Sequence, residues 1–193
     1  MKKLLPFLIV AASSVLPASS ATIFFDLVGK AGAGLIAGNQ NTTVLGTPGS
    51  GGEVGTGIFY DDVANTLRVN VAWGAGNGFT NLTGNATLGH IHGPTTSGGT
   101  ASFTQDAPVL FNLDDTAAWN PSSTLGGITN RIIVLTEVQE GELLAGRYYI
   151  NVHTGTNGGG EIRGNLVVVP EPSALLLGSA AAGIFFLRRR SRA

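Results

Sequence analysis

The sequence predicts an all-β protein, an antiparallel β-sandwich of the Ig-like or Greek-key type with one short helix. Glycine accounts for 29 of the 193 residues and charged residues for 12%, against usual shares of about 7% and about 25%. Short segments alternate between apolar and polar residues, which is the period of a strand with one buried face. Turn-forming residues separate these segments roughly every ten residues, a spacing typical of sandwiches and barrels.

The first strand pair is expected in residues 53–73, EVGTGIFYDDVANTLRVNVAW. Two extended runs flank a turn at residues 61–65, where aspartate and asparagine favour reversal of the chain. In the second run every other residue is apolar, so one face of this strand should enter the core. The apolar residues of that face are Leu67, Val69, Val71 and Trp73.

A second strand pair is expected closer to the C-terminus. RYYINVHT, residues 147–154, alternates in the same way, and EIRGNLVV, residues 161–168, follows the glycine-rich stretch 155–160. Two extended segments joined by such a stretch predict a hairpin with a long turn.

One helix is expected within LTEVQEGELLAGR, residues 135–147. Thr136 and Gln139 have the spacing of a capping box, which satisfies free backbone N–H groups at a helix start. Gly146 is suited to end the helix. Residues 113–130, LDDTAAWNPSSTLGGITN, show no clear period and are expected to form a loop or insertion.

The N-terminal residues 1–21, MKKLLPFLIVAASSVLPASSA, have the features of a helical signal peptide. Two lysines precede a short apolar run, and small residues follow it, as signal peptidase requires. The run is shorter than the ~20 residues that a membrane span needs. We therefore expect export, with signal peptidase as a processing partner and a mature chain that starts near Thr22.

The C-terminal residues combine three parts. Residues 173–187 carry no charge and would form a hydrophobic helix of about 22 Å, against ~30 Å for a hydrocarbon core. A proline-containing tripeptide precedes this stretch and an arginine cluster follows it. The residues of these two flanks are Pro170, Glu171, Pro172, Arg188, Arg189 and Arg190.

This arrangement, over residues 169–193, resembles the PEP-CTERM sorting signal. The resemblance implies a short transmembrane helix in residues 173–187, transient anchoring in the inner membrane of a Gram-negative bacterium and processing by an exosortase. It also implies a bacterium that makes an extracellular polysaccharide matrix. The alternative is a plain single-pass anchor, because basic residues after an apolar stretch remain in the cytoplasm.

The region between the two ends, residues 22–168, is acidic. It has five basic residues and eleven carboxylates, a net charge of −6 with neutral histidines. Nucleic-acid binding requires clustered lysine and arginine, so this function is not expected. The chain has no cysteine, which excludes disulfides and thiolate metal sites.

Three segments of this region carry a second resemblance. GHIHGP (89–94), APVLFNL (107–113) and LTEVQEGELLAGRYYINVHTGTNGGGEIRGNL (135–166) resemble the CHRD domain, a module first recognised in chordin. The resemblance covers residues 22–168 and is tightest over 88–166, whereas residues 31–52 depart from the family's pattern. It implies an extracellular β-sandwich and supplies no agreed catalytic residues.

The three histidines are the candidate metal ligands. His90 and His92 are two residues apart and should project from the same side of a strand. Together with His153 they could hold Cu or Zn, with a water molecule in the fourth position. Glu161 is a candidate fourth ligand, or an acceptor behind the ligands. Alternatively, the imidazoles form hydrogen bonds across neighbouring strands and fix the loops.

Two functions follow from these observations. The first is an exported, exosortase-sorted protein with a non-enzymatic structural or binding role at the cell surface or in the extracellular polysaccharide matrix, where polysaccharide or surface proteins would be its partners. No nucleophile-elbow motif points to catalysis, and no cofactor is then expected. The alternative is a metal-binding redox or hydrolytic domain that uses the three histidines. Copper-zinc superoxide dismutase is excluded, because its two-metal centre needs six histidines.

Overall fold

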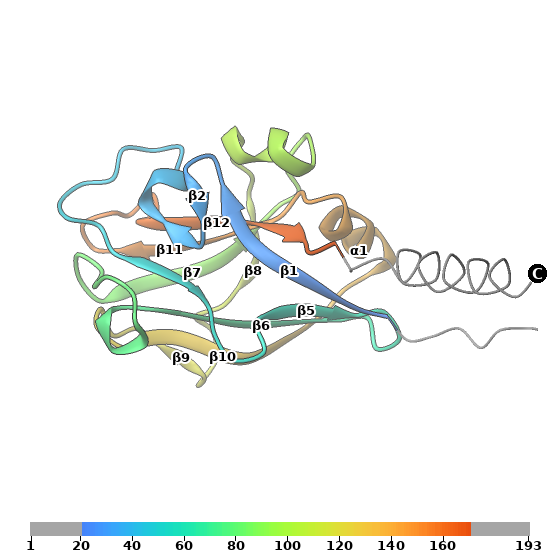
Figure 1. Cartoon of the computed structure of the whole chain (residues 1–193), viewed down its shortest axis with the longest axis horizontal. Helices are drawn as coiled ribbons and strands as arrows, with labels where there is room; N and C mark the ends of the chain where they lie inside the picture. The colour runs from blue at the N-terminus through green and yellow to red at the C-terminus, as the bar shows by residue number, and fades with distance from the viewer. Residues whose placement is uncertain (1–20, 171–193) are drawn as a thin grey trace, which may run out of the picture.

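The computed structural model describes residues 21–170, which form two layers of antiparallel strands and one short α-helix (Figure 1). This confirms the all-β sandwich with one short helix. The predicted signal peptide of residues 1–21 lies outside the described residues except for Ala21. The predicted helix in 173–187, the arginine cluster and Glu171 and Pro172 of the sorting motif also lie outside them. No helix within residues 21–170 is long and apolar enough to cross a membrane.

The two layers are hydrogen-bonded to each other along their edges and form one continuous sheet. One layer contains β4 (Ser50–Glu53), β5 (Ile58–Asp61), β6 (Thr66–Trp73), β9 (Trp119–Asn120) and β10 (Gly126–Val134). The other contains β7 (Ala86–His92), β8 (Val109–Asn112), β11 (Tyr149–Thr154) and β12 (Ile162–Val168). Figure 1 shows β7, β11 and β12 above β5, β6 and β10.

Three N-terminal strands join the two layers: β1 (Thr22–Gly29), β2 (Gly32–Ala33) and β3 (Leu35–Ile36). The first half of β1 pairs with β5 and its second half with β12. Likewise β3 pairs with both β4 and β12. The hydrogen-bonded order is therefore β2-β1-β5-β6-β4-β3-β12-β11-β7-β8, with β10 on β6 and β9 on β10.

The alternating residues of β6 and β11 build the core between the layers. The four apolar residues predicted from β6 are all 0% exposed, as are Tyr148, Ile150 and Val152 at β11. They belong to one apolar cluster that also includes Ile91 of β7 and Ile162 of β12. The predicted core face of β6 is thus confirmed, and the alternation of residues 147–154 also buries every other side chain.

The helix α1 (Glu137–Leu144) is formed where it was predicted. Thr136 accepts from the N–H of Gln139, and the Gln139 side chain accepts from the N–H of Thr136, which completes the capping box. Gly146 has a φ of +68°, the left-handed conformation that ends a helix.

The expectation of a loop over residues 113–130 was wrong in part. This stretch contains β9 and the start of β10, and Gly126 and Gly127 pair with Trp73 and Ala72 of β6. Glycine gives no alternating apolar signal. It is nevertheless required here, because a Cβ at position 126 would lie 2.0 Å from Nε1 of Trp73.

A polar layer covers the outer face of β7, β11 and β12. It consists mainly of the segment 93–108, with the 3-10 helix η3 (Gly99–Thr104), and of η1 (Ala37–Asn39). Arg163 and Asn165 of β12 are both 0% exposed beneath this cover. The three histidines lie on this same outer face, away from the apolar core.

Candidate metal centre

Two antiparallel neighbours, β7 and β11, position the three histidines. His90 lies opposite Asn151 and His92 opposite Tyr149. Because side chains alternate between the two faces of a strand, His90 and His92 project to the outer face while Ile91 between them enters the core. His153 follows Asn151 by two residues and projects to the same face. The prediction that His90 and His92 share one side of a strand is confirmed.

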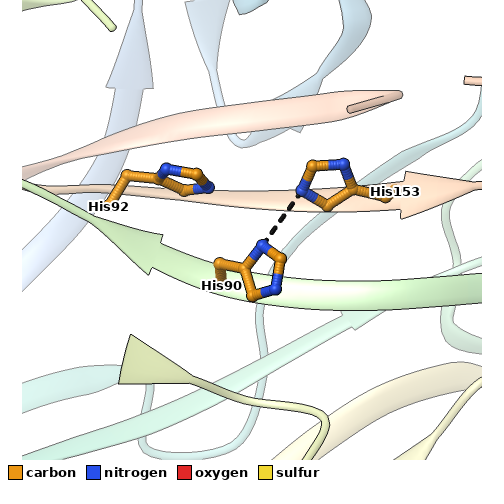
Figure 2. A group of neighbouring side chains, drawn as sticks. All are labelled: His90, His92 and His153. Carbon is orange, nitrogen blue, oxygen red and sulfur yellow. Dashed lines mark hydrogen bonds between the residues drawn. The ribbon is translucent and has the colours of Figure 1, made fainter. Parts of the chain in front are cut away.

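The structure brings the three imidazoles together. Each ring places one nitrogen within 4.8 Å of a nitrogen of the other two, and Nδ1 of His90 is 3.1 Å from Nε2 of His153. Figure 2 shows one nitrogen of each ring turned toward the space between the rings. The residues are only 8%, 9% and 8% exposed, so the nitrogens are largely shielded from bulk water.

The opposite nitrogens of two rings are fixed by backbone carbonyls. Nδ1–H of His92 donates to Ala107 O at 2.9 Å, and Nδ1–H of His153 donates to Gly158 O at 2.8 Å. Both Nε2 atoms are therefore without a proton in the neutral rings. A carbonyl that accepts from the distal nitrogen is the usual partner of a metal-ligating histidine, because it fixes the tautomer and the ring orientation.

His90 has a carboxylate behind it. Its Nε2 lies 4.0 Å from Oδ1 of Asp114, whose Oδ1 also accepts from the N–H of Gly89 at 3.4 Å. A proton on Nε2 would face this carboxylate and leave Nδ1 free toward His153. Without metal, Nδ1–H of His90 donates to the bare Nε2 of His153 at 3.1 Å, the hydrogen bond drawn in Figure 2. A bound cation would displace this proton, and a proton on Nε2 would then face Asp114 while all three inward nitrogens act as electron-pair donors.

Burial favours the neutral form of the two β7 histidines. Desolvation, followed by the neighbouring rings of His153 and His92, lowers the pKa of His90. Desolvation also lowers the pKa of His92, although its hydrogen bond to Ala107 acts in the opposite direction. Neutral imidazole is the form that binds a metal ion, so at neutral pH these rings are in the required state.

An aromatic stack orients His92 from the side. The ring of Tyr149 lies 4.8 Å from the ring of His92 at an interplanar angle of 1°, and the guanidinium of Arg163 lies 3.5 Å from the other face of Tyr149. Tyr149 OH donates to Ala107 O at 3.3 Å, the carbonyl that also accepts from His92. The stack thus connects the centre to the polar layer.

Glu161 has a different role from the predicted ligand. The structure does not bring it into the histidine cluster. Its carboxylate is 0% exposed and accepts from the N–H groups of Gly49 and Thr83, at 2.8 and 2.9 Å, and from the hydroxyl groups of Thr83 and Thr154. It therefore joins two loops to the β11–β12 turn.

Sequence reasoning did not find the supporting residues around the rings. Asp114, Ala107 and Gly158 lie in connecting segments without any period, so no pattern distinguished them. The alternation of RYYINVHT does predict Tyr149 and Asn151 on the face of His153, but it does not predict the stacking of Tyr149 on His92.

Comparison with known proteins identifies one family. A family model described as the CHRD domain matches residues 35–166. No curated protein and no solved structure matches the chain. The matched range includes all three histidines and the strands that carry them, whereas β1 and β2 precede it.

Proposed function

The chain belongs to the CHRD domain family, and from this premise we propose that it is an exported domain that binds one transition-metal ion through His90, His92 and His153. Copper and zinc are the expected ions, because imidazole suits both and copper forms the tightest complexes with nitrogen ligands. The proposed role is binding, because the neighbours that the structure places behind the rings, Ala107 O, Gly158 O and Asp114, hold the imidazoles in position.

One observation carries the proposal. All three inward nitrogens lie within 4.8 Å of one another while the distal nitrogens face Ala107 O, Gly158 O and the Asp114 carboxylate. His92 and His153 turn proton-free Nε2 atoms inward, and Nδ1 of His90 faces Nε2 of His153. A cation in this space would replace the proton that His90 donates to His153 and would bind all three nitrogens.

Metal content tests this proposal. The purified chain, stripped with a chelator, is titrated with Zn²⁺ and Cu²⁺ and analysed by elemental analysis after dialysis. We expect one ion per chain, and loss of that ion in His92→Ala. Leu88→Ala is the matched control, because Leu88 lies on the same face of β7 and is 42% exposed. An empty, folded wild-type chain would contradict metal binding and favour a purely structural role for the rings.

We further propose that the domain acts outside the cell. The predicted signal peptide of residues 1–21 and the PEP-CTERM-like signal of residues 169–193 support export, transient anchoring and exosortase processing. The acidic, cysteine-free composition of the intervening residues suits a domain displayed at the surface or held in a polysaccharide matrix.

Terminal sequencing tests this location. The chain is produced in a Gram-negative host that has an exosortase and is then recovered from the cell surface and medium. We expect an N-terminus near Thr22 and loss of the residues after Pro172. Recovery of the intact 193-residue chain from the cytosol would contradict export.

A further inference from the structure

Asn151 borders the histidine cluster. It projects from β11 between Tyr149 and His153, is 4% exposed, and lies directly opposite His90 in the β7 pairing. Its Oδ1 is 3.2 Å from Nε2 of His92. An asparagine in this position can present an oxygen to the same space that the three rings surround.

The carboxamide of Asn151 meets the free nitrogen of His92. Nδ1–H of His92 already donates to the Ala107 carbonyl, so Nε2 carries no proton and acts as an acceptor. Without metal, the amide NH₂ of Asn151, turned by 180°, donates to Nε2. With Oδ1 on this side at 3.2 Å, the oxygen and the ring nitrogen present electron pairs to the same space, which is the arrangement that a metal ion would bind.

The distances agree with a four-coordinate site. Bonds of about 2.0–2.1 Å to a tetrahedral zinc ion give ligand–ligand distances of roughly 3.3–3.4 Å. The observed separations are 3.1 Å between His90 Nδ1 and His153 Nε2, and 3.2 Å between His92 Nε2 and Asn151 Oδ1. These two separations are close to tetrahedral edges, whereas the three histidine nitrogens lie within 4.8 Å of one another, so the rings would move closer together around a bound ion.

We propose that Asn151 supplies the fourth ligand through Oδ1, completing a site of three nitrogens and one oxygen. This rests on the proposed metal-binding function and makes it more specific. Within residues 21–170 no carboxylate joins the cluster, and the oxygens of Glu161 are occupied by threonine and backbone donors. The site would thus use a neutral oxygen ligand in place of a water molecule or an acid.

A ligand deletion tests the assignment. Asn151→Ala in the purified chain should weaken Zn²⁺ binding about tenfold or more, measured by competition with a chromophoric chelator. It should also change the visible d–d absorption of bound Co²⁺, which reports the coordination sphere. Wild-type affinity together with an unchanged Co²⁺ spectrum would overturn the proposal.

A ligand replacement separates coordination from a general electrostatic effect. Asn151→Asp puts a carboxylate oxygen in the same place and should bind Zn²⁺ about tenfold or more tightly than wild type. Asn112→Asp is the control, because Asn112 lies opposite His90 on β8 and is exposed, so it adds the same charge nearby without ligation. Equal gains in the two variants would overturn the proposal.

Failure of this inference is distinguishable from failure of the proposed function. If wild-type chain binds no metal, the proposed function fails. If wild-type chain and both Asn151 variants bind equally well, the three-histidine function stands and the fourth ligand is not Asn151.

Discussion

Successive residues of β7 and β11 lie alternately in the apolar core and under the polar layer. Ile91 and Ile150 pack into the apolar core, while His90 and His92 on either side of Ile91 face the polar layer. Because the site is built on strands whose other face is fixed by core packing, the rings have little freedom to move. The distal partners of the rings then decide which nitrogen faces inward.

The Asp114 carboxylate behind His90 should strengthen Zn²⁺ binding. Asp114→Asn should weaken Zn²⁺ binding about 10–100-fold, the usual effect of removing a partner behind a metal ligand, because the His90 tautomer loses its carboxylate. Chelator competition measures the affinity. Asp115→Asn is the matched control, since Asp115 is adjacent but pairs with Arg131 at 3.0 Å. The same loss in both variants would contradict a specific role for Asp114.

The buried Glu161 should make the stability of the folded chain depend on pH. Burial would raise the pKa of this carboxyl group, but hydrogen bonds from Thr83, Gly49 and Thr154 outweigh it and lower the pKa. A folded pKa below the unfolded value stabilises the protein above the unfolded pKa, and this stabilisation is lost as pH falls through the folded pKa.

Glu161→Gln should therefore lower the free energy of unfolding by about 3 kcal/mol at neutral pH, because buried donors lose a charged acceptor. The difference from wild type should shrink as the pH is lowered through the acid range. Urea unfolding between pH 7 and pH 2.5 measures both effects. The exposed Glu137 serves as control through Glu137→Gln, and a difference from wild type that does not vary with pH would contradict the assignment.

The sequence allowed the strands with clear alternation to be predicted, and β9 and β10 show where it failed. The hairpins β5–β6 and β11–β12 were found because their turns are rich in glycine, asparagine and aspartate. The start of β10 was missed, since Gly126 and Gly127 have no side chain to alternate. The two-layer pairing of β1 also depends on contacts that no local pattern records.

The same limit applies to the candidate site. The i and i+2 spacing of His90 and His92 predicted a shared face. It could not predict that His153 would join them, because this depends on the register of β7 against β11. For Glu161, both backbone N–H donors come from residues 78 and 112 positions away, and the sequence therefore left it as a candidate ligand.

At the level of elements, Arg163 attaches the 93–108 segment to β12. Its guanidinium donates to Gln105 O at 2.7 Å, pairs with Asp106 at 2.8 Å and lies over the ring of Tyr149. Lysine keeps the charge but lacks the planar group that makes these contacts together. Arg163→Lys should thus release the segment from the sheet.

Hydrogen exchange measures this effect. Amides of residues 99–107 should exchange at least about tenfold faster in Arg163→Lys, while those of β6 and β10 keep their rates. Arg131→Lys is the control, since Arg131 binds Asp115 and the Asn112 carbonyl at a different place. Unchanged exchange in residues 99–107 would contradict the role of Arg163.

For the whole molecule, the core and the metal site are separate sources of stability. The apolar cluster lies between the layers, and the histidines lie outside it under the polar layer. The chain should consequently fold without metal. In this respect it differs from small zinc domains, in which metal binding and folding are one event.

Metal should still raise the stability of the folded chain by mass action. An ion that binds only the folded state at 100 times its dissociation constant adds about 2.7 kcal/mol, which corresponds to a rise in Tm of roughly 5–10 °C for a domain of this size. Calorimetry with and without Zn²⁺ measures the shift, and His92→Ala should abolish it while keeping a cooperative transition. If the metal-free chain showed no cooperative unfolding, the core would not be independent of the site, because β7 and β11 would then need the ion to stay paired.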